Sequence, residues 1–239
     1  MALKIALVGY GKMGHEIEQM ALQRGHSVVA RIGREGIAQH DLSTVDVAIE
    51  FTHPGSALEN VQGLLEAGIA TVCGTTGWYR HLPALEALAQ HTALVYASNF
   101  SLGVNIAFEV NRHLAQLMAE HPSYVPTIEE VHHTAKKDAP SGTAITLAEG
   151  ILGADHHRTE WVLAPKTKDH HLEITSVRKD PVPGTHTVSY TSDIDTLSLT
   201  HVAHSRAGFA LGAVIAAERI MDLGSGIHAF SSLIFQKKK

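Results

Sequence analysis

The feature that most constrains this chain is a glycine-rich turn at residue 9, set between an apolar run and a helical pattern. Residues 2–8 are almost all apolar, as in parallel strands that are covered on both faces. Gly9, Gly11 and Gly14 follow at once. In such a turn the first glycine permits the bend, the second admits a pyrophosphate, and the third allows close helix–strand packing. The spacing predicts a dinucleotide-binding turn; the alternative is a glycine turn in an α/β domain that binds no nucleotide.

Strand and helix patterns alternate as far as residue 99. The expected strands are residues 2–8, 27–30, 46–51, 70–73 and 93–97, and the expected helices are residues 13–23, residues 56–67 with Ser56 as cap, and residues 83–90. Alternation at this spacing is typical of a parallel, doubly wound sheet. The first part of the chain therefore belongs to the α/β class.

The pattern changes between residues 99 and 105, where we expect a second domain to begin. The expected strands are residues 127–132, 171–177, 185–190 and 195–203, and the expected helices are residues 105–120, 141–150 and 209–221. Polar and apolar residues alternate in the later strands, which indicates a sheet with one open face.

Charge and composition exclude several classes of protein. The chain has 239 residues and a formal net charge of −5, so it lacks the basic character expected of a nucleic-acid binder. No apolar run reaches the ~18–20 residues of a membrane span, and the N-terminus does not have the layout of a signal peptide. The single cysteine, Cys73, cannot form a disulfide within the chain. We expect a cytoplasmic protein without nucleic-acid or membrane partners.

The end of the second expected strand bears on which cofactor is bound. NAD-binding chains place an acidic residue there, which binds the ribose 2′-hydroxyl. Residues 30–35 read ARIGRE, with no acid at the strand tip and with Arg31 and Arg34 nearby. Either arginine could hold a 2′-phosphate in a charge-assisted pair, which favours NADPH. The alternative is that both arginines lie on a solvated loop.

The densest concentration of reactive side chains lies in residues 129–144. Ser141, Gly142 and Thr143 open a helix directly after a proline, and free N–H groups at a helix start suit a carboxylate. Lys136 adds a positive charge just upstream. Together with the histidines described next, these groups favour a site for an anionic substrate. The alternative is helix capping by Ser141 beside surface His and Lys.

His132 and His133 can exchange protons near neutral pH. Adjacent residues on a strand point to opposite faces, so the two cannot share one role unless the strand ends there. Paired histidines without a third ligand at suitable spacing form a poor zinc pattern, although distant histidines could contribute. We therefore predict no metal site.

Residues 130–144, EVHHTAKKDAPSGTA, resemble the signature of the dihydrodipicolinate reductase family, also called 4-hydroxy-tetrahydrodipicolinate reductase. These are nicotinamide-dependent oxidoreductases of bacterial lysine and diaminopimelate biosynthesis. Further blocks lie in the family's order at residues 49–54, 74–77, 99–105, 176–178, 184–186, 201–206 and 209–213. The resemblance covers nearly the whole chain.

The resemblance implies a Rossmann-like parallel sheet domain formed by residues 1–103 and 207–239. It also implies a smaller α+β domain with an open mixed sheet, residues 104–206, for substrate binding and assembly into a homotetramer. The implied reaction is NADPH- or NADH-dependent reduction of 4-hydroxy-tetrahydrodipicolinate, a cyclic dicarboxylate, to tetrahydrodipicolinate. The alternatives are a related NAD(P)-dependent amino-acid dehydrogenase and a non-catalytic NAD(P)-sensing module.

The resemblance also assigns roles by position. His132 corresponds to the proton donor and Lys136 to its catalytic partner, and the substrate contacts are His133, Ser141, Gly142 and Thr143. The implied cofactor-binding residues are Gly9, Tyr10, Gly11, Lys12, Met13, Gly14, Gly33, Arg34, Phe51, Thr52, Gly74, Thr75, Thr76, Ala97, Ser98, Asn99 and Phe100.

Overall fold

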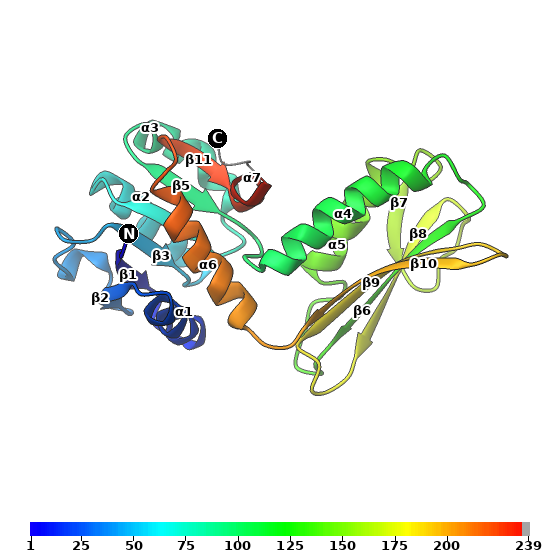
Figure 1. Ribbon diagram of the computed structural model, residues 1–239, viewed down its shortest axis with the longest axis horizontal. Helices are drawn as coiled ribbons and strands as arrows, with labels where there is room; N and C mark the ends of the chain where they lie inside the picture. Colours follow the sequence, from blue (N-terminus) through cyan, green and yellow to red (C-terminus); the bar gives the residue numbers. More distant parts are fainter. Residues whose placement is uncertain (236–239) are drawn as a thin grey trace. The chain divides into compact units, whose positions relative to one another are not determined.

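The computed structural model describes residues 1–235 and divides into two compact units, drawn in Figure 1. The first unit comprises Met1–Leu102 and the described residues from Arg206 onward, and the second comprises Gly103–Ser205. The chain thus leaves the first unit once and returns to it. None of the helices in residues 1–235 combines the length and hydrophobicity needed to cross a bilayer.

The first unit is built on a six-stranded sheet in the order β11-β5-β4-β3-β1-β2, with every neighbouring pair parallel. The strands are β1 (Lys4–Val8), β2 (Ser27–Ile32), β3 (Val47–Glu50), β4 (Ala70–Cys73), β5 (Ala93–Tyr96) and β11 (Gly226–Ala229). The parallel, Rossmann-like sheet is confirmed. The sequence analysis missed β11, because a four-residue strand with a polar member carries too little periodic signal.

Helices cover this sheet. They are α1 (Lys12–Gln23), α2 (Pro54–Glu66), α3 (Glu86–Ala89), α6 (Ala207–Ile220) and α7 (Phe230–Phe235), with short 3-10 turns at Ile37–Gln39 and Tyr79–Leu85. The alanine-rich α6 buries Ala210, Ala213 and Ala217 in the same core cluster as β1 and β3. Small side chains let this helix approach the sheet closely.

Two helix predictions in this unit are wrong in detail. α2 begins at Pro54 after His53, so Ser56 lies inside the helix and is not its cap. Proline suits the first turn because its missing N–H would have had no partner there. The helix expected at residues 83–90 is a 3-10 turn that leads into the short α3. Pro83 lies within that turn, where it cannot donate a helical hydrogen bond.

The second unit holds a five-stranded mixed sheet in the order β10-β9-β6-β8-β7. Its strands are β6 (Val125–His132), β7 (Glu160–Leu163), β8 (His171–Arg178), β9 (Gly184–Thr191) and β10 (Thr196–Ala203), and its helices are α4 (Leu102–Met118) and α5 (Gly142–Leu152). β6 pairs parallel with β8 and antiparallel with β9. The mixed sheet is confirmed; β7, which is short and partly exposed, was missed.

Burial alternates along the central strand β6, and this alternation places the side chains that matter for the site. Ile128, Glu130 and His132 share the buried face of the strand. α5 packs Leu147 and Ile151 into the same core cluster as Ile128. The buried face of β6 therefore changes from apolar to ionisable toward its carboxyl end.

Candidate active site

Five loops of the first unit follow the carboxyl ends of five parallel strands, so they meet at one edge of the sheet. The predicted cofactor residues lie in these loops: Gly9–Gly14 after β1, Gly33 and Arg34 after β2, Phe51 and Thr52 after β3, Gly74–Thr76 after β4, and Ala97–Phe100 after β5. In open parallel sheets, ligands bind at this edge where the strand order reverses, which here is between β1 and β3.

The glycine turn has the shape that a pyrophosphate requires. Gly9 has φ +95°, and a side chain there would overlap the Phe51 carbonyl. A Cβ at Gly14 would lie 2.6 Å from the Gly9 carbonyl oxygen. At Gly11, which caps α1, a Cβ would meet nothing within 4 Å. The turn is packed on its inner side and open at Gly11, so the backbone leaves a cradle that fits a dinucleotide.

Threonine and aromatic side chains organise the neighbouring loops. The Thr52 N–H donates to Thr75 Oγ1 at 2.8 Å. The Phe51 and Phe100 rings lie 5.8 Å apart between centroids. Glu50, fully buried at the end of β3, accepts hydrogen bonds from Thr52 Oγ1 and from Cys73 Sγ. Burial, followed by the nearby Glu50 charge, raises the pKa of the Cys73 thiol well above its ordinary value.

The sequence predicts no acidic residue at the tip of β2, and the structure differs on this point. Glu35 folds back so that its Oε1 accepts from the Gly33 N–H at 2.6 Å. An acid therefore does lie at the strand tip, and the loop conformation brings it there. Arg31 is ion-paired with Glu18 of α1, whereas the Arg34 side chain is exposed. Arg34 is the arginine of the two that does not already hold a carboxylate.

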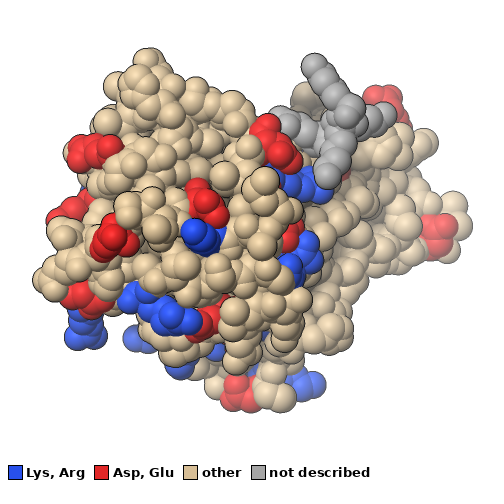
Figure 2. All heavy atoms as spheres, turned by 60° about the vertical axis from the view of Figure 1, so that its left-hand side comes forward, with Lys and Arg blue, Asp and Glu red and all other residues tan. Residues whose placement is uncertain are grey.

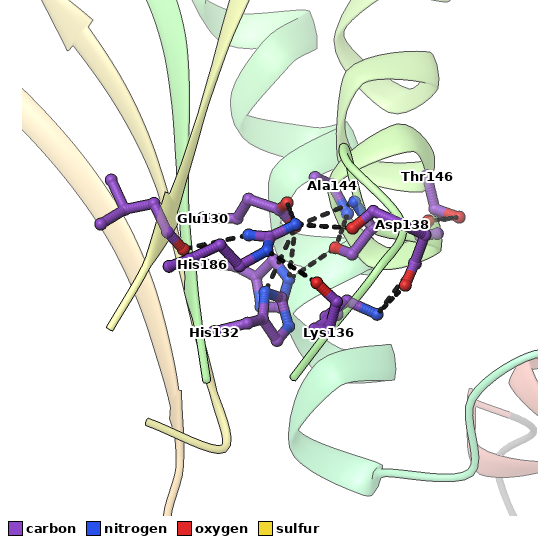
Figure 3. Close-up of polar contacts among 11 residues, drawn as sticks. Glu130, His132, Lys136, Asp138, Ala144, Thr146 and His186 are labelled. Carbon is purple, nitrogen blue, oxygen red and sulfur yellow. Dashed lines mark hydrogen bonds and ion pairs between the residues drawn. The ribbon is translucent and has the colours of Figure 1, made fainter. Parts of the chain in front are cut away.

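In the second unit, a buried carboxylate lies between two histidines and a helix start, as Figure 3 shows. The backbone N–H of Ser141 donates to Glu130 Oε2 at 3.0 Å, and Arg178 Nη2 donates to Glu130 Oε1 at 3.2 Å. His132 Nδ1 lies 3.5 Å and His186 Nε2 3.8 Å from Oε2. These groups come from β6, β8, β9 and the start of α5, so only the folded sheet assembles them.

Burial controls the protonation of both rings. The rings of His132 and His186 pack edge-to-face with centroids 5.0 Å apart. Desolvation, opposed by the negative charge of Glu130, lowers the pKa of His132. Desolvation and the neighbouring His132 lower the pKa of His186 to about 4. His186 is therefore neutral at neutral pH. A dianionic substrate beside His132 would raise its pKa, since negative charge favours the imidazolium form.

Two cationic side chains lie on the exposed side of this cluster. Lys136 Nζ contacts both carboxylate oxygens of Asp138, at 2.8 and 2.9 Å. Arg178 also donates to the Lys136 carbonyl at 3.3 Å and to the Asp138 carbonyl at 2.6 Å. Arg178 thus ties residues 136–138 to the sheet. The Lys136 ammonium is held by an exposed carboxylate, which a substrate carboxylate could replace.

The helix start has the features expected of an anion site. Ser141 caps α5 by accepting from the Ala144 N–H at 3.2 Å, and its Oγ lies 3.1 Å from His186 Nε2. Gly142 is exposed, and a Cβ there would meet nothing within 4 Å. Thr143 is half-buried in the first turn. His133 lies just beyond β6, half-buried, and its carbonyl accepts from the Lys136 N–H.

The sequence pattern offers no third metal ligand beside the paired histidines, whereas the fold brings three possible ligands together. Ligand atoms of Glu130, His132 and His186 lie within 4.8 Å of one another. However, the Arg178 guanidinium already neutralises Glu130, and the Ser141 N–H already occupies Oε2. The carboxylate therefore needs no cation, and we assign none.

Sequence reasoning gave no role to four residues of this site. They are the buried Glu130 and His186, the half-buried Arg178 that pairs with Glu130, and Gly184, where a Cβ would lie 3.1 Å from His132 Nε2. One signal was present in the sequence: Glu130 lies two residues before His132, where the period of the strand calls for an apolar residue.

The sheet order, the glycine turn and the loop edge define the class of Rossmann-type dinucleotide-binding proteins, here with a second α+β unit. Family models place it more closely: "Dihydrodipicolinate reductase, N-terminus" matches residues 3–100, and "Dihydrodipicolinate reductase, C-terminus" matches residues 103–234. The chain belongs to the dihydrodipicolinate reductase family, which confirms the resemblance.

Individual relatives agree with this assignment. A 4-hydroxy-tetrahydrodipicolinate reductase of Christiangramia forsetii is 45% identical over 224 residues, which is 92% of this chain and 93% of the relative. Another, from Thermosipho africanus, is 32% identical over 97% of this chain and 98% of the relative. The structure of a dipicolinate-bound dihydrodipicolinate reductase from Paenisporosarcina sp. TG-14 matches with a TM-score of 0.78 and 22% identity, covering 97% of this chain and 99% of that one.

Proposed function

We propose that this chain reduces 4-hydroxy-tetrahydrodipicolinate to tetrahydrodipicolinate with NAD(P)H, as an oxidoreductase of lysine and diaminopimelate biosynthesis. The family membership supports the reaction. The observation that carries the proposal is the second-unit cluster, which holds a buried imidazole, a lysine ammonium and a capped helix start, groups that suit an anionic ligand. A reduced nicotinamide supplies the hydride when it is bound.

Each proposed residue has a distinct task. His132 donates a proton to the negative charge left on the ring nitrogen and the neighbouring carbon, once the 4-hydroxyl has left as water and hydride has added to the ring carbon conjugated with C=N. Lys136 stabilises that charge and holds one carboxylate after Asp138 is displaced. Ser141, Gly142 and Thr143 bind a carboxylate at the helix start, where N–H groups and the helix dipole favour an anion. His133 contributes a further contact to the substrate.

In the first unit, the proposed cofactor residues form the loop edge described above. Gly11 lets the backbone approach the pyrophosphate, and the loops after β3, β4 and β5 line the nicotinamide. We propose a preference for NADPH, with Arg34 as the group that pairs with the 2′-phosphate, because Arg31 is already held by Glu18. Glu35 is the acceptor that a ribose hydroxyl of NADH would use.

Two broader predictions accompany the proposal. We propose a homotetramer built through the second unit, and a cytoplasmic location stays a prediction from the sequence. A small-molecule substrate agrees with the dipicolinate-bound relative. Acidic and basic side chains are interspersed over the face drawn in Figure 2.

The test is a coupled assay in which the purified chain receives the unstable product of the preceding dehydratase together with NADH or NADPH. We expect the substrate-dependent oxidation of both, with the higher kcat/KM for NADPH. Arg34→Ala should reduce kcat/KM for NADPH about tenfold and leave NADH unaffected, as loss of a charge-assisted hydrogen bond predicts. Glu35→Gln is the matched control, which should affect NADH more.

The alternatives make opposite predictions in the same assay. An amino-acid dehydrogenase would turn over diaminopimelate or aspartate with the oxidised cofactor and leave the dehydratase product unchanged. A sensing module would bind the nucleotide and consume none of these compounds. Either result would overturn the proposal.

A further inference from the structure

Glu130 has more partners than its charge requires. It is fully buried, and burying a carboxylate costs several kcal/mol unless it is paired. The Arg178 guanidinium on Oε1 supplies that pairing. The other oxygen, Oε2, faces three further groups: the Ser141 N–H, the His132 ring and the His186 ring. Two of these groups belong to the proposed site: His132 is the proposed proton donor, and Ser141 opens the proposed carboxylate site.

We propose that Glu130 is a positioning residue of this reaction: one carboxylate oxygen hydrogen-bonds the Ser141 N–H at the start of α5 and attracts the His132 ring across 3.5 Å, which keeps the two in a fixed mutual arrangement. This inference rests on the proposed function, because His132 and Ser141 take their roles from it. Glu130 acts through these two neighbours, and its own side chain is fully buried.

The geometry explains how one oxygen serves both groups. Glu130 and His132 are two residues apart on β6 and therefore share its buried face. Ser141 follows the loop that returns from β6 and places its N–H on the same oxygen, at 3.0 Å. Because Ser141 caps α5, the position of Glu130 also sets where the first turn of that helix begins.

His186 completes the arrangement from β9. Its Nε2 lies 3.1 Å from Ser141 Oγ, and its ring packs edge-to-face on His132. Since its pKa is lowered to about 4 by burial, it is neutral during turnover and adds no charge beside the donor. It is a fixed spacer between the serine and the proton donor.

Glu130 also affects the proton affinity of His132. The charged groups that face this ring are Glu130, Lys136, Asp138 and Arg178, with neutral His186 packed against it. The two carboxylates favour the protonated ring, and the two cations and burial disfavour it. Removing the charge of Glu130 leaves the cations in excess, so the pKa of His132 moves lower still. A proton donor must carry its proton, and kcat then falls at a lower pH than in the wild type.

The experiment compares wild type with Glu130→Gln in kcat and KM across pH. Glutamine keeps the shape and an acceptor for the Ser141 N–H but removes the charge. We expect the alkaline decline of kcat to move to lower pH in the variant. Its kcat should be about tenfold below that of wild type at about pH 8, and the reduction should be much smaller at acid pH. His171→Gln, which changes another buried histidine of the same sheet, should leave the pH profile unchanged.

A second readout does not depend on turnover. The His132 imidazole resonance, identified by its absence in His132→Gln, is titrated by NMR in wild type and in Glu130→Gln. We expect a lower pKa in the variant. An unchanged titration together with an unchanged pH profile would overturn the inference, whereas a wild type without reductase activity would instead overturn the proposed function.

Glu130→Asp keeps the proposal testable where glutamine does not fold. Aspartate preserves the charge but shortens the reach to the Ser141 N–H. The expected result is a pH profile close to that of wild type, with KM for the dicarboxylate raised about tenfold, as for a lost hydrogen bond to a charged group. Wild-type kcat, KM and pH profile in this variant would show that the position of the carboxylate does not matter.

Discussion

The two units build their proposed sites from different materials. The first uses the backbone: Gly9, Gly11 and Gly14 shape a cradle in one contiguous stretch. The second uses buried ionisable side chains, Glu130 and His132 among them, that come from several strands and a helix start. A backbone cradle binds a group common to many ligands, whereas a side-chain network holds one proton donor at one position. We expect substitutions in the two units to fail in different ways.

The largest expected effect is the loss of the proton donor in the second unit. His132→Gln should lower kcat about 10²- to 10⁴-fold, the usual contribution of one positioned acid, while KM for the nucleotide stays near wild type. Steady-state kinetics with saturating substrate measures this. Near-full turnover in the variant would show that His132 is not the proton donor, and the second unit would then not differ from the first in holding a catalytic side chain.

In the first unit, substitutions should act by changing the shape of the backbone cradle. Two of its glycines, Gly9 and Gly11, provide a matched pair of variants. Gly9→Ala puts a side chain at φ +95° against the Phe51 carbonyl, which should destabilise the protein by about 3 kcal/mol or more. Gly11→Ser meets open space, and serine is a good cap for α1, so stability should hold.

The same pair separates folding from binding. Because the Gly11→Ser side chain points into the cradle, KM for NAD(P)H should rise about tenfold, equivalent to ~1.4 kcal/mol, without a change in kcat at saturation. Urea unfolding and nucleotide titration measure the two effects. If both variants lost stability equally, Gly11 would be a structural glycine and the cradle interpretation would be wrong.

This contrast also explains what the sequence could predict. The glycine turn, the parallel sheet and the run from His132 to Thr143 are each contiguous or periodic, so they are visible in one dimension. The contacts of Glu130 with Arg178 and His186 join β6 to β8 and β9, and no local pattern encodes that pairing. Likewise, Glu35 reaches the β2 tip only because the loop turns back on itself. The missing information was which strands pair and how the loop after β2 folds.

The buried network should also make the stability of the protein depend on pH. The pKa of His186 is about 4 in the folded protein and 6.5 in the reference state, so folding disfavours its protonation. The stability that comes from keeping His186 neutral is complete above pH 6.5. It is lost as the pH falls from 6.5 through the folded pKa, and the loss is about 3 kcal/mol at pH 4.

His186→Gln removes that contribution. Relative to the wild type, the variant should therefore gain stability as the pH falls from about 7.5 to about 5. Urea unfolding at both values measures the difference. An exposed histidine, His91, provides the control: His91→Gln should leave the wild-type pH dependence intact. If the free energy of unfolding changed with pH equally in wild type and His186→Gln, the His186 ring would not be the source of the acid sensitivity.

The smallest expected effect concerns the exposed side of the same cluster. Asp138 holds the Lys136 ammonium in the structure, and its side chain is 59% exposed, so the pair is a weak one. Substrate must displace this carboxylate to reach Lys136. Asp138→Asn removes the competitor, and KM for the dicarboxylate should fall about 2- to 5-fold, the range of an exposed ion pair, with kcat unchanged at acid pH, where His132 keeps its proton. Asp193→Asn, an exposed control outside the cluster, should leave KM unaltered. A raised KM in Asp138→Asn would instead mean that Asp138 orients Lys136 for the substrate, which would extend the side-chain network of the second unit to its surface.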